Sequence, residues 1–299
     1  MTRRMISAAA ALLLLAGLTA CSARHVTEYA RERGWEELCI RFFDLTDRKQ
    51  VEALTPASDN PGAEISADGI TVRILQTVAD VRTIYILAET TSENPLPGVP
   101  VRWEAPALTV LHEEGGEPVG GSLRLADSES EPDRMLCLYR FEAAQPLTDG
   151  AALTLQLQDL RCMKENGGAS AVPGSWTISW PLRFADTGRT IAGAEPVVIG
   201  GMLFAGYEIM VSPFSVSVQL TKVGPPRPLN PDVTVQLRDG TEICLQPDLD
   251  LRSTDLTGSR DLEAGRAVEW IYGRLSGVER ADEVACVSVC GVAFSFLDG

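Results

Sequence analysis

The chain has 299 residues, of which 45% are hydrophobic and 22% are charged, and its formal net charge at pH 7 is −15. That balance is typical of a folded globular protein, and the length suggests two domains of ordinary size. The negative charge repels nucleic-acid phosphates and anionic lipid headgroups. We therefore expect no nucleic-acid partner, and any membrane attachment must be covalent or apolar.

The first twenty residues have the pattern of a secretory signal peptide. Arg3 and Arg4 supply positive charge, residues 6–15 form an apolar run, and residues 17–20 are mostly small. The apolar run is too short to span a bilayer comfortably. The stretch "TRRMIS" matches a twin-arginine export signal only in part. Ordinary export is therefore the preferred interpretation.

The end of this leader, Leu18-Thr19-Ala20-Cys21, resembles the lipobox of bacterial lipoproteins. In that family the cysteine thiol receives a diacylglycerol, and a dedicated peptidase cuts before it. The resemblance implies cleavage between Ala20 and Cys21 and a palmitate-type lipid on Cys21. Two acyl chains, at about 0.8 kcal/mol per buried CH₂, hold a soluble domain on a membrane stably. An ordinary signal with a chance cysteine is the alternative.

No later stretch approaches 18 consecutive apolar residues, so no second membrane span is expected. Cys21 is therefore the predicted link to the extracytoplasmic face of the cell membrane. Residues 25–48 favour a helix, either a solvated stalk or a helix docked on the first domain, because Trp35, Phe42 and Phe43 favour burial. Residues 55–63 have the Pro, Ser, Asn and Gly content of a linker.

After residue 64 the sequence alternates between apolar and polar residues, with Gly, Pro and Asp between the runs. Seven strand signals lie at 70–78, 82–91, 101–112 (broken at Pro106), 116–127, 134–143, 151–162 and 175–185. A second series lies at 195–213, 214–223, 232–247, 267–277 and 283–297. The Asp239-Gly240 pair marks a hairpin. The pattern predicts two antiparallel β-sandwich domains, residues 64–187 and 190–299.

Several stretches resemble a known family of secreted β-domains. They are "DGITVRILQTVADVRTIYILAET", "GSWTISWPLRF", "MVSPFSVSVQL", "VQLRDGTEI" and "ADEVACVSVCGVAF". These resemble the paired extracellular domains of unknown function on anti-sigma-factor-like membrane proteins of Gram-positive bacteria. The resemblance implies a mainly β chain with two tandem immunoglobulin-like sandwiches and no assigned chemistry. The transmembrane and cytoplasmic zinc-binding segments of that family have no counterpart here, which places direct sigma-factor control in doubt.

Motifs that carry chemistry are scarce. The two histidines, His25 and His112, lack the spacing of a zinc protease or the context of a catalytic triad. No nucleophile elbow or phosphate-binding glycine loop occurs. Two acidic stretches, residues 127–133 and Asp248, Asp250 and Asp255, could hold calcium but do not follow EF-hand order, so solvated loops are preferred. We expect no catalytic residue, metal or cofactor.

Six cysteines remain besides Cys21, and an even number in an exported protein permits disulfides. Candidate pairs are Cys137 with Cys162, and Cys244 with Cys286 or Cys290. Cys286 and Cys290 lie four residues apart on one predicted strand, about 13 Å by strand rise, which is too far for them to bridge each other. Buried free thiols are the alternative.

Two functional hypotheses follow. In the first, a non-catalytic lipoprotein of the envelope presents its β-sandwich domains to a ligand or another envelope protein, with envelope sensing as one such role. In the second, the protein is an extracellular hydrolase that cleaves glycans with paired carboxylates. The lipobox and the tandem β pattern favour the first.

Overall fold

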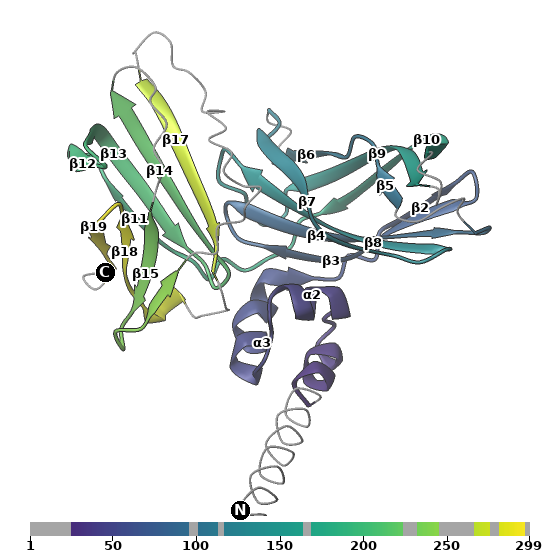
Figure 1. The fold of residues 1–299 in the computed structure, drawn as a ribbon, viewed down its shortest axis with the longest axis horizontal. Helices are drawn as coiled ribbons and strands as arrows, with labels where there is room; N and C mark the ends of the chain where they lie inside the picture. Colours follow the sequence, from purple (N-terminus) through teal and green to yellow (C-terminus); the bar gives the residue numbers. More distant parts are fainter. Residues whose placement is uncertain are drawn as a thin grey trace, which may run out of the picture.

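The computed structural model describes residues 25–95, 101–112, 117–163, 169–223, 232–244, 266–275 and 281–296. The fold is mainly β, with four antiparallel sheets that pack in two pairs, and a short helical segment precedes them. We name the first pair of sheets, residues 58–184, the first unit and the second pair, residues 189–296, the second unit. In Figure 1 the two units meet at one end and diverge from there. No described helix is long and apolar enough to cross a bilayer.

The first unit consists of two sheets around one core. The strand order is β1-β3-β4-β8-β7 in one sheet, with β2 on β3, and β10-β9-β5 in the other, with β6 on β9. Trp103 and Trp176 pack edge to face at 5.0 Å inside it. The strands are β1 Ser58–Asp59, β2 Glu64–Ala67, β3 Ile70–Ala79, β4 Thr83–Ser92, β5 Val101–Trp103, β6 Ala107–Leu111, β7 Gly121–Ser130, β8 Arg134–Ala143, β9 Ala152–Met163 and β10 Ala169–Pro181.

Strands β4 and β8 are buried on both faces. In β4, Ile84 and Ile86 point into the core between the sheets, whereas Tyr85 and Leu87 belong to a separate cluster on the outer face. Continuous apolar runs such as "TIYILA" are the sequence signature of a strand covered on both sides. A further layer must therefore cover this sheet.

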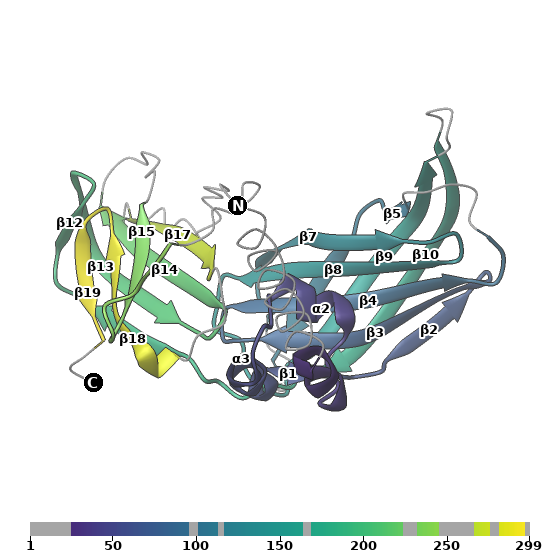
Figure 2. The same ribbon diagram turned by 60° about the horizontal axis from the view of Figure 1, so that its bottom comes forward.

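That layer is the amino-terminal helical segment, which Figure 2 shows lying over β3, β4 and β8. The single helix predicted over residues 25–48 is interrupted: residues 25–32 are helical, Gly34 adopts a φ of 82°, and two helices follow, α2 Glu37–Phe42 and α3 Arg48–Leu54. Asp47 and Gln50 form a capping box at the start of α3. In the structure this segment is therefore docked on the first unit and is not a solvated stalk.

The segment contributes a large share of the outer cluster. Its buried side chains pack against Tyr85, Leu87, Leu136 and Leu138 of the sheet, and they include Trp35, Leu38, Phe43, Val51 and Leu54. The predicted linker at 55–63 is wrong in part, because it contains the 3₁₀ turn η1 Thr55–Ala57 and strand β1, which pairs with β3. No free tether separates the helices from the first sheet.

The second unit is also built from two sheets, with strand orders β11-β13-β14-β17, with β12 on β13, and β16-β15-β18-β19. Gly240, with φ +89°, forms the predicted hairpin turn between β15 and β16. The run 283–297, predicted as one strand, is a hairpin that turns at Cys290 and Gly291. The elements are β11 Arg189–Gly193, β12 Val197–Ile199, β13 Met202–Val211, β14 Ser215–Val223, β15 Val233–Leu237, β16 Glu242–Cys244, β17 Arg266–Arg274, η2 Ala281–Glu283, β18 Val284–Val289 and β19 Val292–Ser295.

Candidate ligand site at the junction of the two units

The two histidines lie apart and belong to no cluster. His25 is exposed on the first helical turn that the structure describes, with Nδ1 3.9 Å from Glu28 Oε2. His112 is half-buried in the first unit, and its Nδ1 lies 3.0 Å from Thr148 Oγ1. Across the described residues, no group of three His, Cys, Asp or Glu side chains is placed to hold a metal ion.

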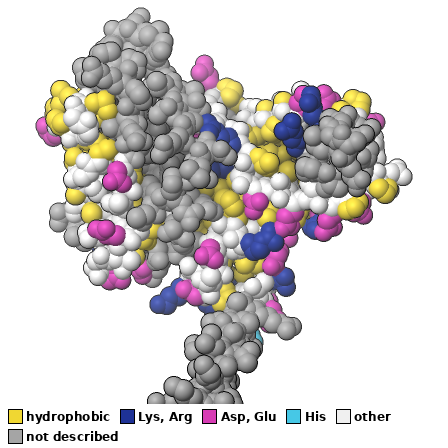
Figure 3. All heavy atoms as spheres, viewed as in Figure 1, with side chains coloured by type: hydrophobic (Ala, Val, Ile, Leu, Met, Phe, Trp, Pro, Cys, Tyr) yellow, Lys and Arg dark blue, Asp and Glu magenta, His cyan; other side chains and the backbone are white. Residues whose placement is uncertain are grey.

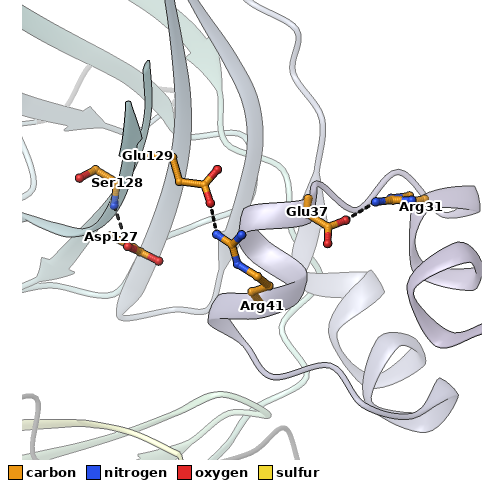
Figure 4. Close-up of polar contacts among 6 residues, drawn as sticks. All are labelled: Arg31, Glu37, Arg41, Asp127, Ser128 and Glu129. Carbon is orange, nitrogen blue, oxygen red and sulfur yellow. Dashed lines mark hydrogen bonds and ion pairs between the residues drawn. The ribbon is translucent and has the colours of Figure 1, made fainter. Parts of the chain in front are cut away.

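The acidic stretch 127–133 lies at the β7–β8 hairpin and contacts the helical segment. Glu129 forms an ion pair with Arg41 of α2, and Asp127 accepts a hydrogen bond from the backbone N–H of Ser128, as Figure 4 shows. Both members of the ion pair are about half exposed, so the pair contributes little to stability. The other acidic group, Asp248, Asp250 and Asp255, lies outside the described residues, as do Ala20 and Cys21.

The cysteines of the first unit have free thiols. Cys137 and Cys162 are buried in its core, and Cys39, on helix α2, is buried between the helical segment and the sheet. The candidate pair Cys137–Cys162 is therefore not bonded in the structure. In the second unit, β15 lies between the strand of Cys244 and that of Cys286. Strands two positions apart are separated by about 9–10 Å, beyond disulfide reach. Cys290 lies in the β18–β19 turn, on the same far side of β15.

Burial predicts which thiols react with an alkylating reagent. Cys137 is 2% exposed, and burial raises the pKa of its thiol to about 11, so it stays protonated and inert at pH 8. Cys286 and Cys290 are half-exposed. Iodoacetamide should therefore modify those two in the native protein and should reach Cys39, Cys137 and Cys162 only in guanidinium, as peptide mass spectrometry would show. A Cys137–Cys162 cross-linked peptide in a non-reduced digest would contradict this expectation.

The junction between the units is made by two hairpin tips. The β3–β4 tip carries Asp80, whose Oδ1 accepts hydrogen bonds from the backbone N–H groups of Arg82 and Thr83 at 2.8 and 2.7 Å. The β13–β14 tip carries Ser215, whose hydroxyl donates to Asp80 Oδ2 at 2.6 Å. Asp80 is 3% exposed, and burial raises the pKa of its carboxyl against the opposing effect of these bonds.

Phe214, from the same β13–β14 tip, joins the second unit to the cluster beneath the helices. Its side chain is 1% exposed, and its ring centroid lies 5.8 Å from those of both Phe43 and Tyr85. One aromatic side chain therefore contacts the helical segment and the first unit together. The two tips that meet here are "VAD" (78–80) and "SPFS" (212–215).

An ion pair between a buried arginine and a partly exposed glutamate crosses the same junction. Arg82, 3% exposed, donates from Nη2 to Glu208 Oε1 of β13 at 2.6 Å and reaches Gln219 Oε1 of β14 at 3.5 Å. Its Nη1 donates to the carbonyl oxygen of Ala144 at 3.2 Å. Figure 3 shows basic side chains in the notch where the two units meet. The outer face of the β11-β13-β14-β17 sheet thus faces the first unit.

A hollow of about 430 Å³ opens beside this ion pair. Glu208 and Gln219 form part of its wall with Thr221 and Tyr207, and the remaining lining residues are small: Ala192, Gly193, Ala194, Ala205 and Gly206. A Cβ on Gly193 would lie 2.6 Å from the Tyr207 ring, so only glycine allows that ring to lie against the strand. These lining residues all belong to the second unit, and the volume is in the range of small-ligand sites.

The residues that line the hollow were not predicted from the sequence. Their one local signal is a repeated Ala-Gly-x-Glu pattern, at 192–195 and 205–208, on strands that pair in the sheet. The partner Arg82 lies more than a hundred residues away in the chain, so its contact with Glu208 could not be anticipated.

Comparison with known proteins supports the fold alone. No family model and no curated protein matches the chain. A solved structure described as the conserved domain protein from Bacillus anthracis is similar, with a TM-score of 0.53 and 14% sequence identity. The similarity covers 78% of this chain and 76% of that one. It supports a mainly β architecture and carries no information about activity.

Proposed function

We propose that this protein is a non-catalytic lipoprotein of the cell envelope. In this proposal a lipid on Cys21 holds it at the extracytoplasmic face of the membrane. Two tandem immunoglobulin-like β-sandwich domains then present the junction between them to a ligand or to another envelope protein. The leader and the lipobox-like Leu18-Thr19-Ala20-Cys21 support the anchor. A role in envelope sensing fits the family resemblance.

The observation that carries the proposal is the position of the packed helical segment relative to Cys21. His25, four residues after the cysteine, is already helical, and the segment packs against the first unit from Val26 onward. Four residues extend at most about 14 Å. A lipid at Cys21 would therefore hold the folded body close to the membrane surface, which suits a receptor or adaptor for partners in the same envelope.

Metabolic labelling tests the anchor. Radiolabelled palmitate should enter the wild-type protein and not the Cys21→Ala variant, and the variant should move from the membrane fraction to the soluble exported fraction. A Cys39→Ala variant serves as the matched control, because Cys39 is a buried thiol outside the lipobox. Equal labelling of wild type and Cys21→Ala would refute the anchor.

A further inference from the structure

From the hollow beside Arg82 we infer a binding site for a neutral saccharide. This inference deepens the proposed binding role by naming the class of ligand. It depends on the pocket lined by Glu208, Gln219 and Thr221 and on the buried guanidinium that reaches its wall from the other unit. The site does not depend on the lipid anchor.

The polar atoms that line the hollow offer both donors and acceptors. Arg82 engages Oε1 of Glu208 and Oε1 of Gln219. Within the described part of the chain this leaves Oε2 of Glu208 as an acceptor, Nε2 of Gln219 as a donor, and the hydroxyl of Thr221 as either. A ligand must therefore accept and donate hydrogen bonds at neighbouring atoms, as adjacent hydroxyl groups do.

The spacing of these groups matches a compact ligand. Glu208 and Gln219 are directly paired across β13 and β14, and Thr221 lies two residues along β14 on the same face. Paired and diagonal neighbours on a sheet lie about 5–8 Å apart. Hydroxyls on one or two sugar rings fall within that span.

The charges disfavour ionic ligands. Glu208, whose side chain is 37% exposed, is paired with the guanidinium of Arg82, so the two charges compensate each other. The hollow therefore offers no uncompensated charge to an anionic or a cationic ligand. An apolar ligand would cover Oε2 of Glu208, Nε2 of Gln219 and the Thr221 hydroxyl without offering them hydrogen bonds. A neutral, polar ligand needs no uncompensated charge and can form hydrogen bonds with these polar groups.

An extended peptide is a poorer fit than a sugar. Strands β13 and β14 are interior strands of their sheet, because each is paired on both sides. Their backbone groups are already engaged, so a peptide could not add to the sheet there as an extra strand. The hollow therefore favours side-chain contacts, which suits hydroxyl recognition.

Substitutions at the hollow test the inference. Ala192 is exposed, lines the hollow and pairs with Glu208, so Ala192→Phe should fill the space without disturbing the core. Thr221→Val removes a hydroxyl at constant volume. Thr190→Phe is the matched control, because Thr190 is an exposed residue of the same strand and face but lies outside the lining.

The measurement is isothermal titration of the detergent-purified full-length protein with chitotetraose, cellotetraose, maltotetraose and mannotetraose. A basic and an acidic hexapeptide are titrated alongside. At least one saccharide should bind. Ala192→Phe should weaken that binding at least tenfold and Thr221→Val by roughly 5- to 10-fold, the loss of about one hydrogen bond, whereas Thr190→Phe should leave it unchanged.

Four outcomes would overturn the inference: binding to none of the saccharides, binding only to a peptide, binding indifferent to Ala192→Phe and Thr221→Val, or equal weakening by Thr190→Phe. Unfolding midpoints of all variants establish that each is folded. Palmitate labelling is measured separately. A protein that is labelled but binds no sugar would refute the saccharide site and would still support the lipid anchor.

Discussion

Replacing Phe214 by alanine is expected to lower the free energy of unfolding by about 3–5 kcal/mol, the usual cost of truncating a buried phenylalanine. The ring is 1% exposed and contacts both Phe43 of the helical segment and Tyr85 of the first unit. Its loss opens a cavity where three parts of the chain meet. Urea denaturation followed by tryptophan fluorescence would measure the change.

Leu203→Ala provides the control for Phe214→Ala. Leu203 also lies in the second unit but is 52% exposed, so its truncation should change stability by no more than about 0.5 kcal/mol. A cost below about 1 kcal/mol for Phe214→Ala would show that the junction does not depend on this side chain. Faster proteolysis within residues 25–57 of the Phe214→Ala variant would further locate the damage at the helical segment.

Asp80→Ala is expected to cost about 2–4 kcal/mol. The change removes the acceptor for two backbone N–H groups and for the hydroxyl of Ser215, and a buried donor left without a partner costs about 1–3 kcal/mol. Asp80→Asn should cost less, because an amide retains one acceptor oxygen and its nitrogen can donate to Ser215. Denaturant midpoints of the two variants at pH 7 would separate these effects.

The same carboxyl should make stability depend on pH. Burial raises the pKa of Asp80 above its ordinary value of 3.8, so the native state binds the proton more tightly than the unfolded chain does. The stabilisation from this group is complete below pH 3.8 and is lost as pH rises through the raised native pKa. Wild type should therefore lose stability relative to Asp80→Asn as pH rises from about 4 towards 7. A difference constant with pH would contradict the raised pKa.

Most strands were predictable because their side chains alternate with a period of two. The runs predicted at 70–78, 82–91 and 134–143 correspond closely to β3, β4 and β8. The β18–β19 turn was missed, because it forms at Cys290 (φ 49°) and Gly291 (φ 80°), in a stretch without an Asn-Gly or Asp-Gly pair. A short hairpin without such a turn pair is predicted as one continuous strand.

The contacts at the junction could not be predicted from the sequence, because they join residues far apart in the chain. Asp80 and Ser215 are separated by 135 residues, and no sequence pattern around either residue indicates a contact with the other. Both stretches looked like ordinary strand ends. The docking of the helical segment had a clearer signal, since the uninterrupted apolar run of β4 requires cover on both faces.

The docked segment also determines where the protein can be truncated. A fragment that began at the first predicted strand would uncover Tyr85, Leu87, Leu136 and Leu138 together and would remove Phe43 from beside Phe214. A contiguous apolar surface of that kind promotes aggregation. Recombinant forms of this protein should therefore keep residues 25–57, and insolubility of a shorter fragment would reflect a missing layer of the fold rather than an intrinsically insoluble β-sheet.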